Sequence, residues 1–261
     1  MGKSLTAETE DGIVVTDRFV AVIDGSTSKT PRHIQPGISN GRFCMTLIAE
    51  YIRNNRDVAT CEDFCHGITG FVKAHYHDTA IGRLATHPEE RLTASCIVYS
   101  CACREIWMVG DCKCLVDGRP FDNPKHCEQA IAEKRAEIAT KLIASGKASV
   151  DSLRENDIAR SAILPELVRS MAGQNKDYAV VDGFPIPMGK VRRIAVPQNA
   201  HNVVLASDGY PELRPTLQES EEALCLQLQS DPLNILRFKA TKAFMVGNNS
   251  FDDRAYIRFE P

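Results

Sequence analysis

Acidic residues stand at several places where a short, strand-like apolar run begins or ends. These are Glu10-Asp11, Asp24, Asp208 and Asp252-Asp253, with Asp111 as a fifth after Val109-Gly110. In Asp24-Gly25 and Asp208-Gly209 the carboxylate would be fixed by a strand, and the glycine would let a backbone oxygen approach an ion closely. Mg²⁺ and Mn²⁺ are hard ions that prefer such oxygen ligands. The pattern predicts a metal centre if the fold brings these ends together.

A pair of such ions carries a specific chemistry. Two ions joined by a bridging carboxylate can activate a water and stabilise an in-line displacement at phosphorus. The alternative is that these residues are solvated turn aspartates, because most Asp-Gly pairs are simply turns. Each aspartate taken alone fits that simpler explanation. Three apolar strands with an acidic end favour the metal site.

The elements that would position these carboxylates can be predicted from residue spacing. Two strands joined by a turn at Thr16-Asp17 cover the region up to residue 23, and residues 26–40 form a loop. A helix begins at Gly41, and its apolar face is formed by Phe43, Leu47, Ile48, Tyr51 and Ile52. A second helix spans residues 62–77, capped by Thr60 or Asp63.

Strands and helices then alternate in blocks along the chain. Residues 92–118 predict an antiparallel meander with Gly110-Asp111 at its second corner. Residues 126–142 and 158–171 predict helices, the latter broken by Pro165. We expect a hairpin over 178–189, strands over 190–196, 201–206 and 255–259, and helices over 216–228 and 233–238. This order predicts an α+β fold, with two antiparallel sheets packed face to face and helices outside, as a single domain over residues 1–261.

Composition narrows the class of protein. The 261 residues carry a net charge of −3, and no basic excess suggests binding to nucleic acid or to an anionic membrane surface. No run approaches the roughly 18 apolar residues of a membrane span, and the start, MGKSLTAETED, has no secretory h-region. Most of the ten cysteines stand in apolar runs. We expect reduced thiols in a cytoplasmic protein.

Several segments, in order along the chain, resemble motifs of the metal-dependent protein phosphatases of type 2C (the PPM family). Glu10-Asp11 followed by Val22-Ile23-Asp24-Gly25 resembles the opening motif of the family. Residues 205–209 match its Leu-Ala-Ser-Asp-Gly motif. The remaining segments are Leu92-Thr93-Ala94-Ser95, Trp107-Met108-Val109-Gly110-Asp111 and Asp252-Asp253-Arg254-Ala255-Tyr256-Ile257. Together they extend over nearly the whole chain.

This resemblance implies an αββα sandwich and a phosphatase that acts on phosphoserine or phosphothreonine in proteins. Asp24 would bridge two Mg²⁺ or Mn²⁺ ions, and the Gly25 carbonyl would bind one of them. Asp208 and Asp252 would complete the coordination of the first ion. Glu10 or Asp11 would coordinate the second, directly or through water. Asp111 with Asp208 would hold a third, weaker ion. The nucleophile would be the bridging water, with Asp24, Asp11 and Asp208 as the catalytic residues and no phospho-enzyme.

The chain departs from the family in two places that concern substrate. Ser26-Thr27-Ser28 stands where the family has glycines and, in some members, a histidine that acts as general acid; His33 or solvent would then protonate the leaving group. The phosphate-gripping arginine before the acidic pair is missing, and Lys3 or Lys29 would replace it. A small phosphate ester is therefore an alternative substrate. A pseudophosphatase that binds a phosphorylated partner or scaffolds another protein is the alternative function.

Two other patterns in the sequence have simpler explanations. Gly25 to Thr30 resembles a P-loop, but that motif requires four residues between its glycines and a glycine directly before the lysine. The pairs Cys101/Cys103 and Cys112/Cys114 have a spacing that zinc could use, yet no histidine is nearby in the sequence. Buried thiols are the favoured interpretation.

Overall fold

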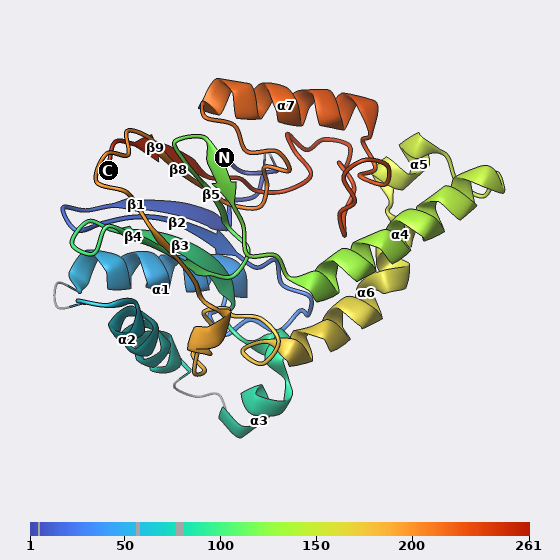
Figure 1. Ribbon diagram of the computed structural model, residues 1–261. Helices are drawn as coiled ribbons and strands as arrows, with labels where there is room; N and C mark the ends of the chain where they lie inside the picture. The colour runs from blue at the N-terminus through green and yellow to red at the C-terminus, as the bar shows by residue number, and fades with distance from the viewer. Residues whose placement is uncertain (5, 56–57, 77–80) are drawn as a thin grey trace.

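Two antiparallel β-sheets and the helices around them make up the protein, seen in a computed structural model that describes residues 1–4, 6–55, 58–76 and 81–261 (Figure 1). The first sheet has the strand order β1 (Asp11–Val15), β2 (Phe19–Gly25), β3 (Ala94–Ser100), β4 (Glu105–Val109) and β7 (Arg192–Ala195). The second has the order β6 (Arg119–Phe121), β5 (Lys113–Val116), β8 (Val203–Ala206) and β9 (Tyr256–Phe259).

The alternation of side chains in β2 explains how the layers pack. Ala21 and Ile23 belong to the core beneath α1 (Asn40–Asn54) and α2 (Cys61–Lys73), whereas Val20 and Val22 belong to the core between the two sheets. Successive strand residues point to opposite faces, so a strand buried on both faces is apolar throughout. On the second sheet, α7 (Leu217–Ser230) packs Leu224 and Leu228 near Ala206 of β8. The predicted sandwich of two sheets between helices is confirmed.

Three helices extend beyond the end of the sheets, namely α4 (His126–Ala144), α5 (Val150–Glu155) and α6 (Ile158–Ser170) (Figure 1). The fully buried Arg135 of α4 joins them to the rest of the chain. Its guanidinium donates to Asp157, the N-cap of α6, at 2.6 and 3.0 Å, and to the carbonyl of Leu233 at 2.8 Å. Residues 126–170 therefore form one wall beside the sheet ends.

The first two predicted helices are present, and the second has its expected cap. Ser39 caps α1 by accepting the backbone N–H of Arg42. In α2 the Thr60 hydroxyl accepts the Asp63 N–H, and the Asp63 carboxylate accepts the Thr60 N–H, so both predicted capping residues take part. The helix ends at Lys73, earlier than predicted, and His77 lies outside the described residues.

Several local predictions were wrong. Residues 92–118 do not form one meander, because the chain leaves the first sheet after β4 and enters the second at β5, through Gly110 with φ +100°. Pro165 lies inside α6 on its exposed side, and the helix continues past it to Ser170 despite the lost N–H bond and the clash of its ring with the preceding turn. Residues 178–189 contribute two isolated bridges, Ala94 to Val181 and Gln174 to Tyr178, instead of a hairpin. Residues 233–238 form turns whose N–H groups bond to the Asp231 carboxylate.

Among the described helices, which include α3 (Ile81–Thr86) and three short 3-10 turns (Pro88–Glu90, Met171–Gly173 and Met188–Lys190), none has the length and apolar character needed to span a membrane.

Candidate metal centre

Three aspartates converge where strands from both sheets end. Asp24 lies at the end of β2, Asp111 follows β4 and Asp208 follows β8. One carboxylate oxygen of each lies within 4.8 Å of the others. Oxygens that share one Mg²⁺ ion lie about 2.0–2.1 Å from it, and so about 3–4 Å apart, a spacing that these three carboxylates approach. The donor set of these three aspartates, called the aspartate triad below, therefore fits one hard divalent cation.

The glycines after two of these aspartates allow close backbone contacts. A Cβ on Gly25 would lie 2.5 Å from the Glu10 carbonyl oxygen, and the Gly25 N–H donates to that oxygen at 3.1 Å. A Cβ on Gly209 would lie 2.0 Å from the Asp253 carbonyl oxygen. Glycine at these positions thus brings the two strand ends against the neighbouring acidic segments.

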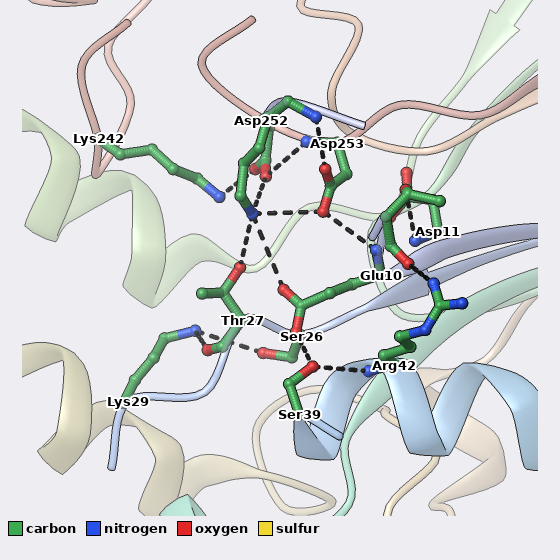
Figure 2. Close-up of polar contacts among 12 residues, drawn as sticks. Glu10, Asp11, Ser26, Thr27, Lys29, Ser39, Arg42, Lys242, Asp252 and Asp253 are labelled. Carbon is green, nitrogen blue, oxygen red and sulfur yellow. Dashed lines mark hydrogen bonds and ion pairs between the residues drawn. The ribbon is translucent and has the colours of Figure 1, made fainter. Parts of the chain in front are cut away.

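A second acidic group surrounds the ammonium of Lys3. Lys3 Nζ lies 3.4 Å from Asp252 Oδ1, 3.3 Å from Asp253 Oδ2 and 3.8 Å from Glu10 Oε2. Figure 2 shows the Glu10, Asp252 and Asp253 carboxylates pointing into one small region beside Thr27, with Lys242 reaching Asp252 from another side. The predicted residues Glu10 and Asp252 thus lie together, in contact with cations.

Asp11 lies near both of these acidic groups. It pairs with Asp24 across β1 and β2, and its Oδ2 is buried without a hydrogen-bond partner. Burial and the nearby Asp252 and Asp208 raise the pKa of Asp11 to about 8, although a hydrogen bond with Ser207 opposes the rise. An unpartnered buried carboxylate oxygen is costly unless a cation or water meets it.

The charges around the centre divide the carboxylates into two kinds. Burial and the neighbouring acids raise the pKa of Asp24 and of Asp208 well above its usual value. Burial acts the same way on Asp111 and Asp252, but lysines outweigh it and hold the pKa of each below its usual value. A divalent ion at the triad would relieve the repulsion that acts on Asp24 and Asp208.

Lys125 is a residue of this site that sequence reasoning missed. It is the N-cap of α4, and its Nζ lies 2.8 Å from Asp111 Oδ1 and 3.2 Å from Ser95 Oγ. The acids Asp111 and Glu128 raise the pKa of Lys125 despite its burial. Its local sequence, Asn-Pro-Lys-His, carries no signal for such a role. Lys242, on a loop far along the chain, was missed for the same reason.

A cavity of about 260 Å³ opens beside the triad, and its lining includes both acidic and basic side chains. The cations that line it are Lys29, Lys113, Lys125, Arg160, Lys239 and Lys242. Lys29 donates to the Thr27 carbonyl at 2.7 Å and to Ser26 Oγ at 3.3 Å. Burial and the nearby cations Lys242 and Arg160 lower the pKa of Lys29 to about 8, although Glu128 opposes them. An anion such as a phosphoryl group would complement these charges.

The other predicted candidates lie elsewhere. His33 is exposed on the loop before α1, and it is not part of the cavity lining. All ten cysteines of the chain fall within the described residues and are free thiols. The prediction of buried thiols is confirmed for Cys112 and Cys114 and is wrong for Cys101 and Cys103, which are exposed. Within the described ranges the aspartate triad is the one group of histidine, cysteine or acidic residues with metal-ligand spacing.

No protein-family model matches this chain. No curated protein sequence matches it either. Similar solved structures include the serine/threonine phosphatase Stp1 of Staphylococcus aureus, with a TM-score of 0.45, 11% identity, and coverage of 100% of this chain and 93% of the other. The Mycobacterium tuberculosis serine/threonine phosphatase PstP/Ppp gives a TM-score of 0.41, 15% identity, and coverage of 84% and 80%. RsbX in complex with magnesium gives a TM-score of 0.43 and 12% identity, with coverage of 99% of this chain and 90% of the other.

Proposed function

We propose that this protein is a metal-dependent phosphatase of the serine/threonine type that hydrolyses phosphomonoesters. The observation that carries this proposal is the convergence of Asp24, Asp111 and Asp208 oxygens within 4.8 Å, beside a cavity lined with cations. The type 2C motifs of the sequence support the same reading, because three of the segments that resemble them carry these aspartates. A bound Mg²⁺ or Mn²⁺ would supply an activated water and offset negative charge on the phosphoryl oxygens.

The residues of the site would have three roles: binding the metal ion, orienting a water and binding the substrate phosphate. Asp24, Asp111 and Asp208 would hold the ion, and the Gly25 carbonyl is a further candidate ligand. Asp11, whose buried Oδ2 lacks a partner, would orient a water at the ion. Lys29, Arg160 and Lys242 line the cavity and would bind the oxygens of the substrate phosphate. Because the described cavity lining contains no histidine, we expect solvent to protonate the leaving group.

Phosphoserine or phosphothreonine in a protein is the substrate that we propose first, and a small phosphate ester is the alternative. Lys125 of the α4 cap and Arg160 of α6 both line the cavity, so a substrate bound there would also meet these two helices. A comparison of kcat/KM for a phosphothreonine peptide and for p-nitrophenyl phosphate would separate the two. A protein phosphatase should prefer the peptide by about tenfold or more, because residues around the phosphate add contacts.

The central test is hydrolysis of p-nitrophenyl phosphate with Mn²⁺ and with EDTA, in the wild type, Asp24→Ala and Asp208→Asn. We expect turnover that requires Mn²⁺ and falls at least about 100-fold in both variants, because each removes a metal ligand. Asp17→Asn, the same type of change at an exposed turn between β1 and β2, is the matched control and should retain activity. Turnover that survives EDTA or Asp24→Ala would contradict the proposal.

A second function is favoured by one specific observation. Both oxygens of Asp252 contact ammonium groups, Lys3 at Oδ1 and Lys242 at Oδ2, so part of the acidic set is already neutralised by the chain itself. A pseudophosphatase would use the cationic cavity to bind a phosphorylated partner without hydrolysis. Fluorescence anisotropy with a labelled phosphothreonine peptide would then show binding that EDTA does not abolish, with no release of phosphate.

We also propose that residues 1–261 act as a single domain in the cytoplasm. The ten free cysteines support a reducing compartment, since oxidising compartments favour disulfides. Limited proteolysis that yields no stable fragment shorter than the full chain would support the single domain.

A further inference from the structure

We propose that the ammonium of Lys3 takes the place of a second metal ion, so that this centre binds one divalent ion instead of two. This inference rests on the proposed metal site and refines it. It also gives Lys3 a role that differs from the phosphate contact predicted from the sequence.

The contacts of Lys3 match those expected of a bound cation. Its Nζ donates to Thr27 Oγ1 at 3.2 Å, to Asp253 Oδ2 at 3.3 Å and to Asp252 Oδ1 at 3.4 Å. An ammonium has three N–H donors and no acceptor, so this set uses all of them. The side chain is only 23% exposed. Lys3 is therefore occupied inside the site and has no donor left for a substrate.

Each carboxylate oxygen around Lys3 already faces a donor, so a second ion would have to compete with that donor for it. Asp252 uses Oδ1 for Lys3 and Oδ2 for Lys242. Asp253 accepts the backbone N–H of Lys3 on Oδ1, at 2.7 Å, and the N–H of Glu10 on Oδ2, at 3.1 Å. Glu10 accepts the Ser39 hydroxyl on Oε1 and lies 3.8 Å from Lys3 through Oε2. All six oxygens thus already face a hydrogen-bond donor or an ammonium.

The backbone holds Lys3 in this position from both sides. The Lys3 carbonyl accepts the N–H of Asn249 at 2.7 Å, and the Met1 carbonyl accepts the N–H of Arg254 at 2.9 Å. Ser4 forms an isolated antiparallel bridge with Asn248. The segment from Met1 to Ser4 is therefore paired along residues 248–254, and this pairing positions Lys3 beside Asp252 and Asp253.

Charge makes the ammonium and a nearby second ion mutually exclusive. The Lys3 ammonium is enclosed by three carboxylates, those of Asp252, Asp253 and Glu10, and its positive charge is fixed among them. A divalent ion among the same carboxylates would face that fixed charge at a few ångströms, in a partly buried setting where repulsion is poorly screened. The aspartate triad, which excludes Asp252, keeps the spacing for one ion.

The test measures the number of Mn²⁺ ions bound, by isothermal titration calorimetry and by metal analysis after equilibrium dialysis. We expect about one ion in the wild type and about two in Lys3→Met, which keeps an unbranched side chain of similar size but removes its charge. Lys134→Met is the matched control, because it removes a lysine paired with Glu166 on the surface, away from the site. It should bind about one ion.

The outcomes separate this inference from the proposed function. If wild type and Lys3→Met bind the same non-zero number of ions, Lys3 does not replace a metal, although the metal site itself remains. If the wild type binds none and Lys3→Met binds one, the triad proposal fails while Lys3 keeps its role. If neither protein binds an ion, both proposals are overturned.

A second measurement uses only the wild-type protein, in case Lys3→Met does not fold. Acetylation of lysines with acetic anhydride, followed by mass spectrometry, reports whether Lys3 stays in the cluster when Mn²⁺ is added. We expect Lys3 to remain at least about fivefold less reactive than Lys141, which is 79% exposed, with and without the ion. Faster acetylation of Lys3 on addition of Mn²⁺, with Lys141 unchanged, would show that metal displaces the ammonium and would overturn the inference.

Discussion

The ammonium of Lys125 lies 2.8 Å from Asp111 Oδ1, so the residue that opens α4 neutralises a carboxylate at the end of β4. Lys125 is the cation that couples the helical wall to the aspartate triad. Its charge competes with a metal ion for Asp111, and it lines the cavity where a phosphoryl group would bind.

Lys125→Met should therefore tighten metal binding while it weakens turnover. Removing the positive charge next to the triad should lower the Kd for Mn²⁺ by about tenfold, because one unit of nearby repulsion disappears. The kcat/KM for p-nitrophenyl phosphate should fall, since the cavity loses one of the positive charges that line it. Calorimetry and steady-state kinetics measure the two effects, with the exposed Lys141→Met as control. An unchanged Kd would show that Lys125 does not influence the ion.

Gly25→Ala should destabilise the fold and weaken metal binding. The new Cβ would lie 2.5 Å from the Glu10 carbonyl and 2.6 Å from the Gly41 carbonyl, so the backbone must shift. We expect a loss of about 2–3 kcal/mol in the free energy of unfolding, measured with urea. Gly70→Ala, in α2 with open space around its Cβ, is the control and should be neutral or stabilising. Equal stability of the two variants would contradict the close contact.

Arg135→Met should loosen the wall formed by α4 and α6. The change leaves the buried Asp157 carboxylate without its cation and the carbonyls of Leu233 and Ala240 without a donor. We expect a loss of about 3–5 kcal/mol in the free energy of unfolding, the usual cost of breaking a buried ion pair. Lys134→Met removes a surface pair from the same helix and should cost at most about 1 kcal/mol. Urea unfolding of both variants checks the contrast.

Asp182 should make stability depend on pH. Burial raises the pKa of this carboxyl to about 6 in the folded protein, although Arg91 at 2.8 Å opposes the rise. Its pKa in the unfolded chain is about 3.9. The raised pKa means that the fold favours the protonated form of Asp182. Its contribution to the free energy of unfolding is therefore full below about pH 4. This contribution declines as the pH rises to about 6, by up to about 3 kcal/mol.

The measurement for Asp182 compares urea unfolding of wild type and Asp182→Asn between pH 4 and pH 7. The variant should be less stable at pH 4, because Asn cannot donate and accept in the same pattern as the protonated acid. Its stability should then fall less steeply as pH rises, since no proton is released at this position. Identical slopes for the two proteins would show that the carboxyl does not titrate in this range.

The sequence by itself determined most of the local structure. The apolar spacing from Phe43 to Ile52 predicts α1, and the Thr60/Asp63 pair predicts the start of α2, because both signals act within a few residues. The acidic strand ends Asp24 and Asp208 could also be recognised from sequence. Predictions failed where distant contacts decide the local conformation, as in residues 178–189, which form one bridge to Ala94 and no hairpin.

Only the tertiary structure decided which charges meet. Asp24, Asp111 and Asp208 come from strands in two sheets, and their convergence depends on the crossing of the chain between the sheets after β4. Lys3 and Lys242 reach Asp252 from opposite ends of the sequence. Lysine is common on protein surfaces, so its type and spacing carry no signal for burial among carboxylates. The spatial pairing of acids with these lysines sets the charge of the centre, and that pairing exists only in the folded chain.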